Sequence, residues 1–307
     1  LEHNVKFRRL SVSAGFTAVR NTLSGMPFKI YPGIDASYAL MGDLKAYVSF
    51  NMSLRTPSFT ELYYSVDGHK ADKHLKPEEM KAVEAGLRYA PRGIVASLSV
   101  YRNWGRNMID WIMDINQADG RTGRQGDGGS QAGSASQLAC LSTRNSSQYK
   151  VWTSVNHAKV NSTGVEADVK LDLRRLVPGQ RVLRSFSVAY AYIDQDQRRE
   201  EGVLSLYALE YLRHKVVAKL GLNILPNLNF DASYRYQERV GSYADTEGVS
   251  RSYKPYSLVD ARLSWDKPRY GVYLEANNLL DASYVDYGNV PQPGFWIMAG
   301  AVWNFRF

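Results

Sequence analysis

The stretch Val165-Glu166-Ala167-Asp168-Val169-Lys170-Leu171-Asp172-Leu173 decides the fold class, because apolar and ionic residues alternate in it without a break. Successive side chains of a β-strand point to opposite faces, so this segment has one apolar face and one charged face as a strand. An amphipathic helix would instead place its apolar residues three or four positions apart. Residues 165–173 therefore predict a strand that separates an apolar environment from a hydrated one.

The same alternation recurs along the whole chain, and no helical stretch of comparable strength competes with it. The further segments that show it are 10–18, 44–50, 83–89, 186–192, 218–224, 230–236, 259–265, 272–276 and 295–307. Together with weaker segments they predict about twelve strands. The expected fold is an all-β, antiparallel, up-and-down sheet over residues 1–307.

The connections between these segments alternate between short and long. Tight turns with Gly, Pro, Asn or Asp are expected near 41–43, 91–93, 177–179, 225–227 and 266–268. Long loops are expected at 56–78, 114–148, 194–209, 239–255 and 280–294, with a shorter one near 21–26. Every second connection of an up-and-down sheet lies on the same rim, so all tight turns share one rim and all long loops share the other. With an even number of strands, both termini would lie on the short-turn rim.

Composition is compatible with strands that cross a membrane. The chain has 44% hydrophobic and 22% charged residues and a mean hydropathy of −0.36. It has no run of about 18 apolar residues, which a transmembrane helix requires, whereas a transmembrane strand needs only about 9–11 alternating residues. A soluble antiparallel sheet alternates in the same way. The 21 Tyr and 6 Trp gather near strand ends, as interfacial girdles do, and favour a transmembrane β-barrel with a wet lumen.

Charge and cysteine content exclude several other classes. The net charge of +8 is spread without a run of four basic residues, so we expect no nucleic-acid partner. The single cysteine, Cys140, lies in the Gly-, Ser- and Gln-rich stretch 120–147 and cannot form an internal disulfide. His69, Asp72 and His74 are expected in a solvated polar loop rather than in a metal site. We therefore expect no metal, no cofactor and no catalytic residue.

Several stretches resemble one family, the TonB-dependent outer-membrane receptors. The stretches that carry the resemblance are Arg55-Thr56-Pro57-Ser58-Phe59-Thr60-Glu61-Leu62-Tyr63, Leu75-Lys76-Pro77-Glu78 followed by Glu84-Ala85-Gly86-Leu87-Arg88-Tyr89, Tyr101-Arg102-Asn103 with Met108-Ile109-Asp110 and Gly164-Val165-Glu166-Ala167, Asn277-Asn278-Leu279-Leu280-Asp281 with Tyr284, and Trp303-Asn304-Phe305-Arg306-Phe307. They follow the family's order across nearly the whole chain. The resemblance implies import of a scarce nutrient, cobalamin or a ferric siderophore, with no reaction catalysed. The 102–110 and 164–167 segments look slightly closer to cobalamin receptors.

The resemblance covers only the C-terminal half of such a receptor. Family members have a plug domain and a barrel of roughly 22 strands, so residues 1–307 are expected to be the C-terminal part of that barrel, without plug and N-terminal strands. The implied partners are the lipid of a Gram-negative outer membrane, the missing strands and plug, the TonB complex acting through that plug, and the nutrient. Trp303, Phe305 and Phe307 resemble the C-terminal insertion signal, although Gly300 and Val302 depart from its pattern.

Ligand contacts are expected at aromatic and polar loop tips, where large ligands are held by stacking and hydrogen bonds. The candidates are Tyr63, Tyr64, His69, Trp104, Trp111, Tyr243, Tyr253, Tyr287 and Gln292. The alternative roles of these residues are girdle and loop packing. The 120–147 stretch could act as a lid or be an insertion.

Two other function classes compete. An outer-membrane hydrolase would need a serine and a histidine on one face, and Ser154 and Ser162 do flank His157, with Asn156 and Asn161 nearby. However, one strand cannot place consecutive neighbours on a shared face, and the sequence has no strained nucleophile turn. The other alternative is a passive twelve-stranded pore or translocator, which needs no plug.

Overall fold

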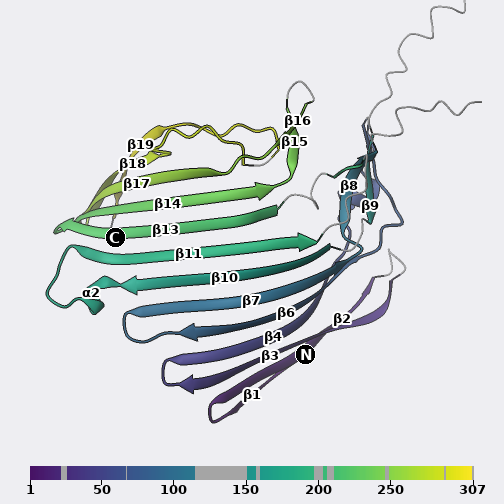
Figure 1. Ribbon diagram of the computed structural model, residues 1–307, viewed down its shortest axis with the longest axis horizontal. Coiled ribbons are helices and arrows are strands. Elements are labelled where there is room, and N and C mark those ends of the chain that lie inside the picture. The colour runs from purple at the N-terminus through teal and green to yellow at the C-terminus, as the bar shows by residue number, and fades with distance from the viewer. Residues whose placement is uncertain are drawn as a thin grey trace, which may run out of the picture.

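A computed structural model describes residues 1–21, 26–66, 68–114, 151–156, 160–196, 203–205, 211–245, 249–286 and 288–305. Its main feature is one antiparallel sheet of 13 strands in the order β1-β2-β3-β4-β6-β7-β10-β11-β13-β14-β17-β18-β19 (Figure 1). The strands are β1 (Glu2–Phe7), β2 (Leu10–Asn21), β3 (Met26–Met41), β4 (Leu44–Arg55), β6 (Glu78–Tyr89), β7 (Ile94–Arg106), β10 (Val160–Asp172), β11 (Leu183–Asp196), β13 (Tyr211–Leu225), β14 (Leu228–Val240), β17 (Tyr256–Asp266), β18 (Tyr270–Asn277) and β19 (Trp296–Trp303). The predicted all-β, antiparallel, up-and-down order is confirmed.

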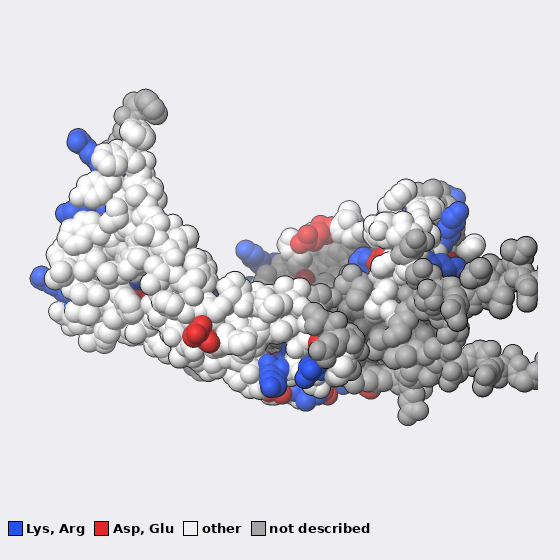
Figure 2. Space-filling model, turned by 90° about the horizontal axis from the view of Figure 1, so that it is seen from above, with Lys and Arg blue, Asp and Glu red and all other residues white. Residues whose placement is uncertain are grey.

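The sheet is curved and open. Figure 1 shows its strands side by side, with the short connections at one end and the long connections at the other. In the described part of the chain, β1 and β19 form the two edges and are not paired with each other. Figure 2 shows the molecule hollowed on one side, between two raised parts.

The predicted apolar positions all lie on one face of this sheet. Residues that are paired across an antiparallel ladder point to the same face, and one such row crosses seven strands. The row is Val12, Ala36, Val48, Ala85, Val100, Val165 and Tyr192. Within this face Leu87, Leu98 and Val100 are 44%, 47% and 48% exposed, so no second layer of described residues covers them.

The opposite face is polar and its side chains bond across the strands. Tyr47 donates to Glu84 at 2.8 Å, and Ser97 donates to Asp168. Arg262 donates to Glu275 at 3.2 Å. Two hydroxyl–carboxylate hydrogen bonds and one ion pair thus join neighbouring strands on this face, and such cross-strand pairs stabilise the sheet.

Three tyrosine–glycine pairs on the polar face explain glycines inside strands. In each pair the tyrosine ring lies over the glycine directly opposite on the next strand, where a β-carbon would collide with it. The pairs are Tyr47 with Gly86, Tyr101 with Gly164 and Tyr273 with Gly300, and an added β-carbon would lie 2.6, 2.3 and 2.4 Å from the ring. The rings replace the missing side chains and cover the bare backbone.

One strand, β1, was not expected from the sequence, and it changes the strand count from about twelve to 13. The hairpin between β1 and β2 turns at Arg8 and Arg9, which are not typical turn residues, and Arg8 takes a φ of +51°. Pro32 lies inside β3, where proline is normally disfavoured. It is tolerated because pairing with β4 begins only at Gly33. The prediction that both termini share the short-turn rim is therefore wrong: β1 runs from opposite the middle of β2 to the short turn, so the N-terminus lies away from that rim (Figure 1).

Two predicted strand ends also differ. Leu173 does not continue its strand but begins α2 (Leu173–Leu176), because the Asp172 side chain accepts a hydrogen bond from the amide of Arg175 and caps this turn. The last strand, expected over 295–307, spans only Trp296–Trp303. The two helices of the described residues are both too short and too polar to cross a membrane.

The long connections carry structure of their own, where the sequence predicted loops. They contain α1 (Phe59–Tyr63) and a small sheet in the order β12-β8-β9-β5. Its strands are β5 (His69–Lys70), β8 (Ile109–Asp114), β9 (Trp152–Asn156) and β12 (Val203–Ser205). A second small sheet pairs β15 (Ser242–Ala244) with β16 (Ser250–Ser252).

We predict that Gly164→Ala lowers the free energy of unfolding by about 1–3 kcal/mol, because the new methyl group displaces the Tyr101 ring. Gly42→Ala is the matched control, since nothing lies within 4 Å of its added β-carbon. Denaturant titration of the refolded protein measures both. A Tyr101→Ser background should remove most of the cost at Gly164, and an equal cost with and without the ring would contradict the pairing.

Candidate ligand-binding rim

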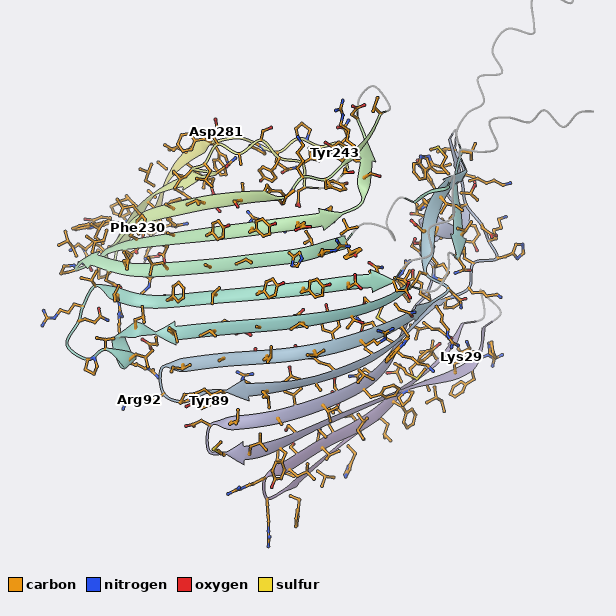
Figure 3. All side chains as sticks on the ribbon, in the orientation of Figure 1. Lys29, Tyr89, Arg92, Phe230, Tyr243 and Asp281 are labelled. Carbon is orange, nitrogen blue, oxygen red and sulfur yellow. The ribbon has the colours of Figure 1, made fainter. Side chains whose placement is uncertain are left out.

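The long-connection rim holds two groups of aromatic and charged side chains. The first rim cluster comprises Phe59, Tyr63, Tyr64, His69 and Trp111, on and between α1 and the β12-β8-β9-β5 sheet. The second rim cluster comprises Arg239, Tyr243, Tyr253, Tyr256, Tyr284 and Asp286, at the far end of β14 and in the connections beside it. Figure 3 labels Tyr243, which is part of β15, at this end of the sheet.

Arg55, the last residue of β4, anchors the first rim cluster. Its Nε and Nη2 atoms each donate to the Glu78 carboxylate at 2.6 Å, in a bidentate pair. Its Nη1 atom donates to both carboxylate oxygens of Glu61 at 3.0 Å. One guanidinium therefore joins β4, β6 and α1, as planar arginine forks do when they bridge carboxylates.

Glu61 also fixes the start of α1. Its carboxylate accepts a hydrogen bond from the Ser58 amide at 2.7 Å, and its own amide donates to the Ser58 hydroxyl at 3.3 Å. This reciprocal arrangement is a capping box, which satisfies two backbone donors at the helix start. Residues Arg55–Leu62 of the sequence motif thus anchor α1 to β4 and β6, and this explains the motif without ligand contact.

Ser154 and Asn156 of β9 hold the small sheet to the connection above β4. The Ser154 hydroxyl accepts from the Asp72 amide and donates to the Glu61 carbonyl, both at 2.8 Å, and it is 0% exposed. The Asn156 side chain accepts from the Lys76 amide at 2.7 Å and donates to the Lys76 carbonyl at 2.8 Å. The Ser154 hydroxyl is therefore a structural bridge, without the exposure that a nucleophile needs. His157 lies outside the described residues.

The aromatic side chains of the first rim cluster divide into buried and exposed members. His69 lies between Tyr64 and Trp111, with ring centroids 6.0 and 5.4 Å away. Trp111 is only 7% exposed, whereas Tyr63 and Tyr64 are 43% and 47% exposed. Trp111, a residue of β8, is therefore buried within the cluster, and Tyr63 and Tyr64 remain available to a ligand.

The second rim cluster is tied together by hydroxyl groups. The Tyr256 hydroxyl lies 2.6 Å from the Gln237 side-chain oxygen and 2.8 Å from the Asp286 carboxylate, and its one proton is shared between these two acceptors. Its ring centroid lies 4.3 Å from that of Tyr284. Burial raises the pKa of the Tyr284 phenol; Arg235 opposes this rise, and Asp286 adds to it. Tyr284 thus stays a neutral hydrogen-bonding group at physiological pH.

Arg239 joins the Tyr256–Tyr284 ring pair and Asp286 to the second ring pair, Tyr243 and Tyr253. Its Nη2 atom lies 3.6 Å from the Asp286 carboxylate, and its guanidinium lies 5.7 Å from the Tyr253 ring centroid. Tyr243 and Tyr253 are 5.1 Å apart, and the Tyr253 hydroxyl accepts from the Gly288 amide at 2.8 Å. Tyr253 is 8% exposed, so it packs the connection and leaves Tyr243 nearer the solvent.

Of the remaining predicted residues, Gln292 adjoins the second rim cluster, whereas Trp104, Trp303 and Phe305 lie apart from both clusters. Trp104 is on the apolar face, in the same row of β7 as Leu98 and Val100, with the Arg102 guanidinium 5.7 Å from its ring centroid. Gln292 is half-buried, and its backbone amide donates to the Tyr284 carbonyl at 3.0 Å. Trp303 and Phe305 are 64% and 74% exposed. The residues that lie outside the described part are Tyr287, Phe307, Cys140 and 120–147.

Four members of the second rim cluster were not predicted from the sequence as ligand contacts: Arg239, Tyr256, Tyr284 and Asp286. A signal for one of them was present, because Arg235, Gln237 and Arg239 alternate on the polar face where β14 reaches the rim. Asp286 carries no such signal, since its position depends on how the connection after β18 folds back. Among the described residues, no three His, Cys, Asp or Glu side chains gather as metal ligands.

We predict that Arg55→Gln lowers the free energy of unfolding by about 1–3 kcal/mol, because two neighbouring carboxylates lose their shared cation. Hydrogen exchange in residues 58–78 should speed up. Arg251→Gln is the matched control, because the exposed Arg251 side chain forms one ion pair, with Asp245 at 2.7 Å, and its loss should leave the free energy of unfolding nearly unchanged. Unchanged exchange in Arg55→Gln would show that the network does not hold the rim.

Comparisons with known proteins find the same architecture in one family. The family model described as "TonB dependent receptor-like, beta-barrel" matches residues 1–279. A mutant of the ferric enterobactin receptor PfeA from Pseudomonas aeruginosa is similar, with a TM-score of 0.66 and 18% identity over 98% of this chain and 43% of that one. The siderophore receptor PirA from the same organism gives 0.64 and 15%, over 98% of this chain and 47% of that one.

The FrpB iron transporter from Neisseria meningitidis is also similar, with a TM-score of 0.63 and 13% identity, over 98% of this chain and 44% of that one. At these identities the likeness shows a shared fold, and the chain spans less than half the length of each of these structures. The match of the family model extends over most of the chain and includes every strand of the 13-stranded sheet except β19. The chain belongs to the TonB-dependent receptor family, as part of its β-barrel.

Proposed function

We propose that this chain forms part of the wall of an outer-membrane receptor that imports a scarce nutrient and is energised through TonB. The observation that carries the proposal is the 13-stranded sheet with one apolar face, one polar face and a structured rim, in a chain of this family. The apolar face would contact the lipid of a Gram-negative outer membrane, and the polar face would line the lumen. Enzymes of the hydrolase class are disfavoured, because Ser154 is buried and bonded on both sides.

The chain by itself would be the C-terminal part of such a barrel. The main support is that it aligns with less than half of each similar receptor. In the described residues, β1 and β19 each have one hydrogen-bonded neighbour, and an unpaired strand edge is costly in lipid. Further strands would close the wall, and a plug domain in its lumen would pass the pull of TonB to the ligand site.

We propose that the nutrient is an iron chelate, with cobalamin as the alternative. The three similar structures are described as a ferric enterobactin receptor, a siderophore receptor and an iron transporter, which supports iron. The exposed Tyr63 and Tyr64 of the first rim cluster could stack on flat aromatic groups of a chelate. Cobalamin stays an alternative because the loops that would select the substrate lie partly outside the described residues.

The lipid-facing assignment predicts different costs for the same substitution on adjacent residues of β11. Val188 is on the apolar face, so Val188→Arg should cost about 2–4 kcal/mol of refolding stability in lipid vesicles. Ala189 is next to it at the same depth on the polar face, so Ala189→Arg should cost less than about 1 kcal/mol. Denaturant titration measures both, and equal costs would argue for a soluble sheet.

The nutrient is tested by uptake into cells. Deleting the gene should abolish uptake of radioactive ferric enterobactin, in the same way as loss of TonB, and leave cobalamin uptake unchanged. Loss of cobalamin uptake alone would favour the alternative substrate. TonB-independent leakage of both compounds would instead favour a passive pore.

Two aromatic side chains at the same rim sharpen this test. Tyr64→Ala in the restored gene should weaken ligand binding about three- to tenfold, as expected for loss of one aromatic contact. Trp104→Ala should leave binding unchanged, because Trp104 lies on the apolar face. If both substitutions weaken binding equally, the first rim cluster does not contact the ligand.

A further inference from the structure

The short-turn rim, opposite the two rim clusters, holds a basic pocket that the transport proposal does not use. Its volume is about 720 Å³, and it lies between the connection 90–93 and α2. The side chains and turn that form its charged wall are Arg92, Gly93, Lys170, Asp172, Arg174 and Arg184. Figure 3 labels Arg92 at this end of the sheet, near Tyr89.

The two connections around the pocket are fixed to each other. The Asp172 amide donates to the Gly93 carbonyl at 2.8 Å. Gly93 has a φ of +83°, and a β-carbon there would lie 3.2 Å from the Arg175 β-carbon and 3.3 Å from Leu176. The turn can therefore pack tightly against α2 only because residue 93 is glycine. The pocket has preformed walls, as small-molecule sites usually do.

The pocket carries more positive charge than its acidic neighbours balance. Arg175 pairs with Asp172 at 3.0 Å, and Arg184 pairs with Asp231. Three further cations, Arg92, Lys170 and Arg174, line the same pocket. None of these three lies within ion-pair distance of a carboxylate among the residues that the structure describes.

Arg174 is held in place by a neutral partner. Its Nη2 atom donates to the Asn223 side-chain oxygen at 2.6 Å, across to β13. An amide orients the guanidinium without neutralising it, so its charge remains available to an anion. Lys170 adds a mobile ammonium from β10, and Arg92 adds a second guanidinium from the turn.

We infer that this pocket binds the phosphate group of a phosphate ester. A phosphate monoester carries nearly two negative charges near pH 7 and three strong acceptor oxygens, which suits three uncompensated donors better than a carboxylate does. Val95, which pairs with Lys170 on the same face of the sheet, also lines the pocket and offers an apolar surface to the organic part of the ester. The source could be the phosphomonoester headgroup of a lipid such as phosphatidic acid or a soluble ester, since both present the same group.

Titration of the refolded protein in zwitterionic detergent with inorganic phosphate tests the site, by calorimetry or ³¹P line broadening. We expect saturable binding of one phosphate, weakened about tenfold in both Lys170→Gln and Arg174→Gln. Arg181→Gln is the matched control: Arg181 is an exposed arginine of the same connection that does not line the pocket. Binding that does not saturate, or that Arg181→Gln weakens equally, would overturn the inference.

Circular dichroism shows whether Lys170→Gln or Arg174→Gln misfolds. In that case Arg92→Gln replaces the misfolded variant, because Arg92 is exposed on the turn and its substitution should not disturb the fold. Two probes separate the sources. If only phosphatidic acid in phosphatidylcholine vesicles is bound, and Arg92→Gln weakens that binding, the ligand is a lipid headgroup. If glycerol 3-phosphate binds in solution with the same dependence on Lys170, it is a soluble ester. If neither probe depends on Lys170 or Arg174, the site does not exist.

Discussion

The hydrogen-bonded register of the 13-stranded sheet is the constraint on which the rest of the structure depends. A slip of one residue would move every side chain of a strand to the other face. In the observed register, Val165 lies between Val100 and Tyr192, and its neighbour Glu166 lies between Ser99 and Ala191. The tyrosine–glycine pairs strengthen this register, because each ring fits only opposite a residue without a side chain.

The long connections are ordered where they are tied back to strand ends. Arg55 at the end of β4 holds Glu78 and Glu61, and Ser154 then joins Glu61 to the small sheet. The exposed tyrosines beside α1 are thus mounted on a supported scaffold, which lowers the entropic cost of binding a ligand. The proposed nutrient site and its supports are therefore different residues: Tyr64 is offered to solvent, and Trp111 is buried beneath it.

The two rims have different chemistry. The long-connection rim combines tyrosines with arginines whose charges are matched by Glu78 or Asp286. The short-turn rim gathers Arg92, Lys170 and Arg174 without matching carboxylates among the described residues. The strands place these two sets of side chains at opposite ends of the sheet, so one sheet can hold two separate ligand sites.

The sequence by itself determined the strands, their apolar face and the alternation of short and long connections, because these follow from a period of two and from local turn residues. It did not reveal β1, whose turn at Arg8 lacks the usual residues, and so the odd strand count was missed. Only the tertiary structure decided that β5 pairs with β9, that Trp111 is buried while Tyr64 is exposed, and that α2 closes a pocket against Gly93. Each of these depends on contacts between segments far apart in the chain, which local periodicity does not encode.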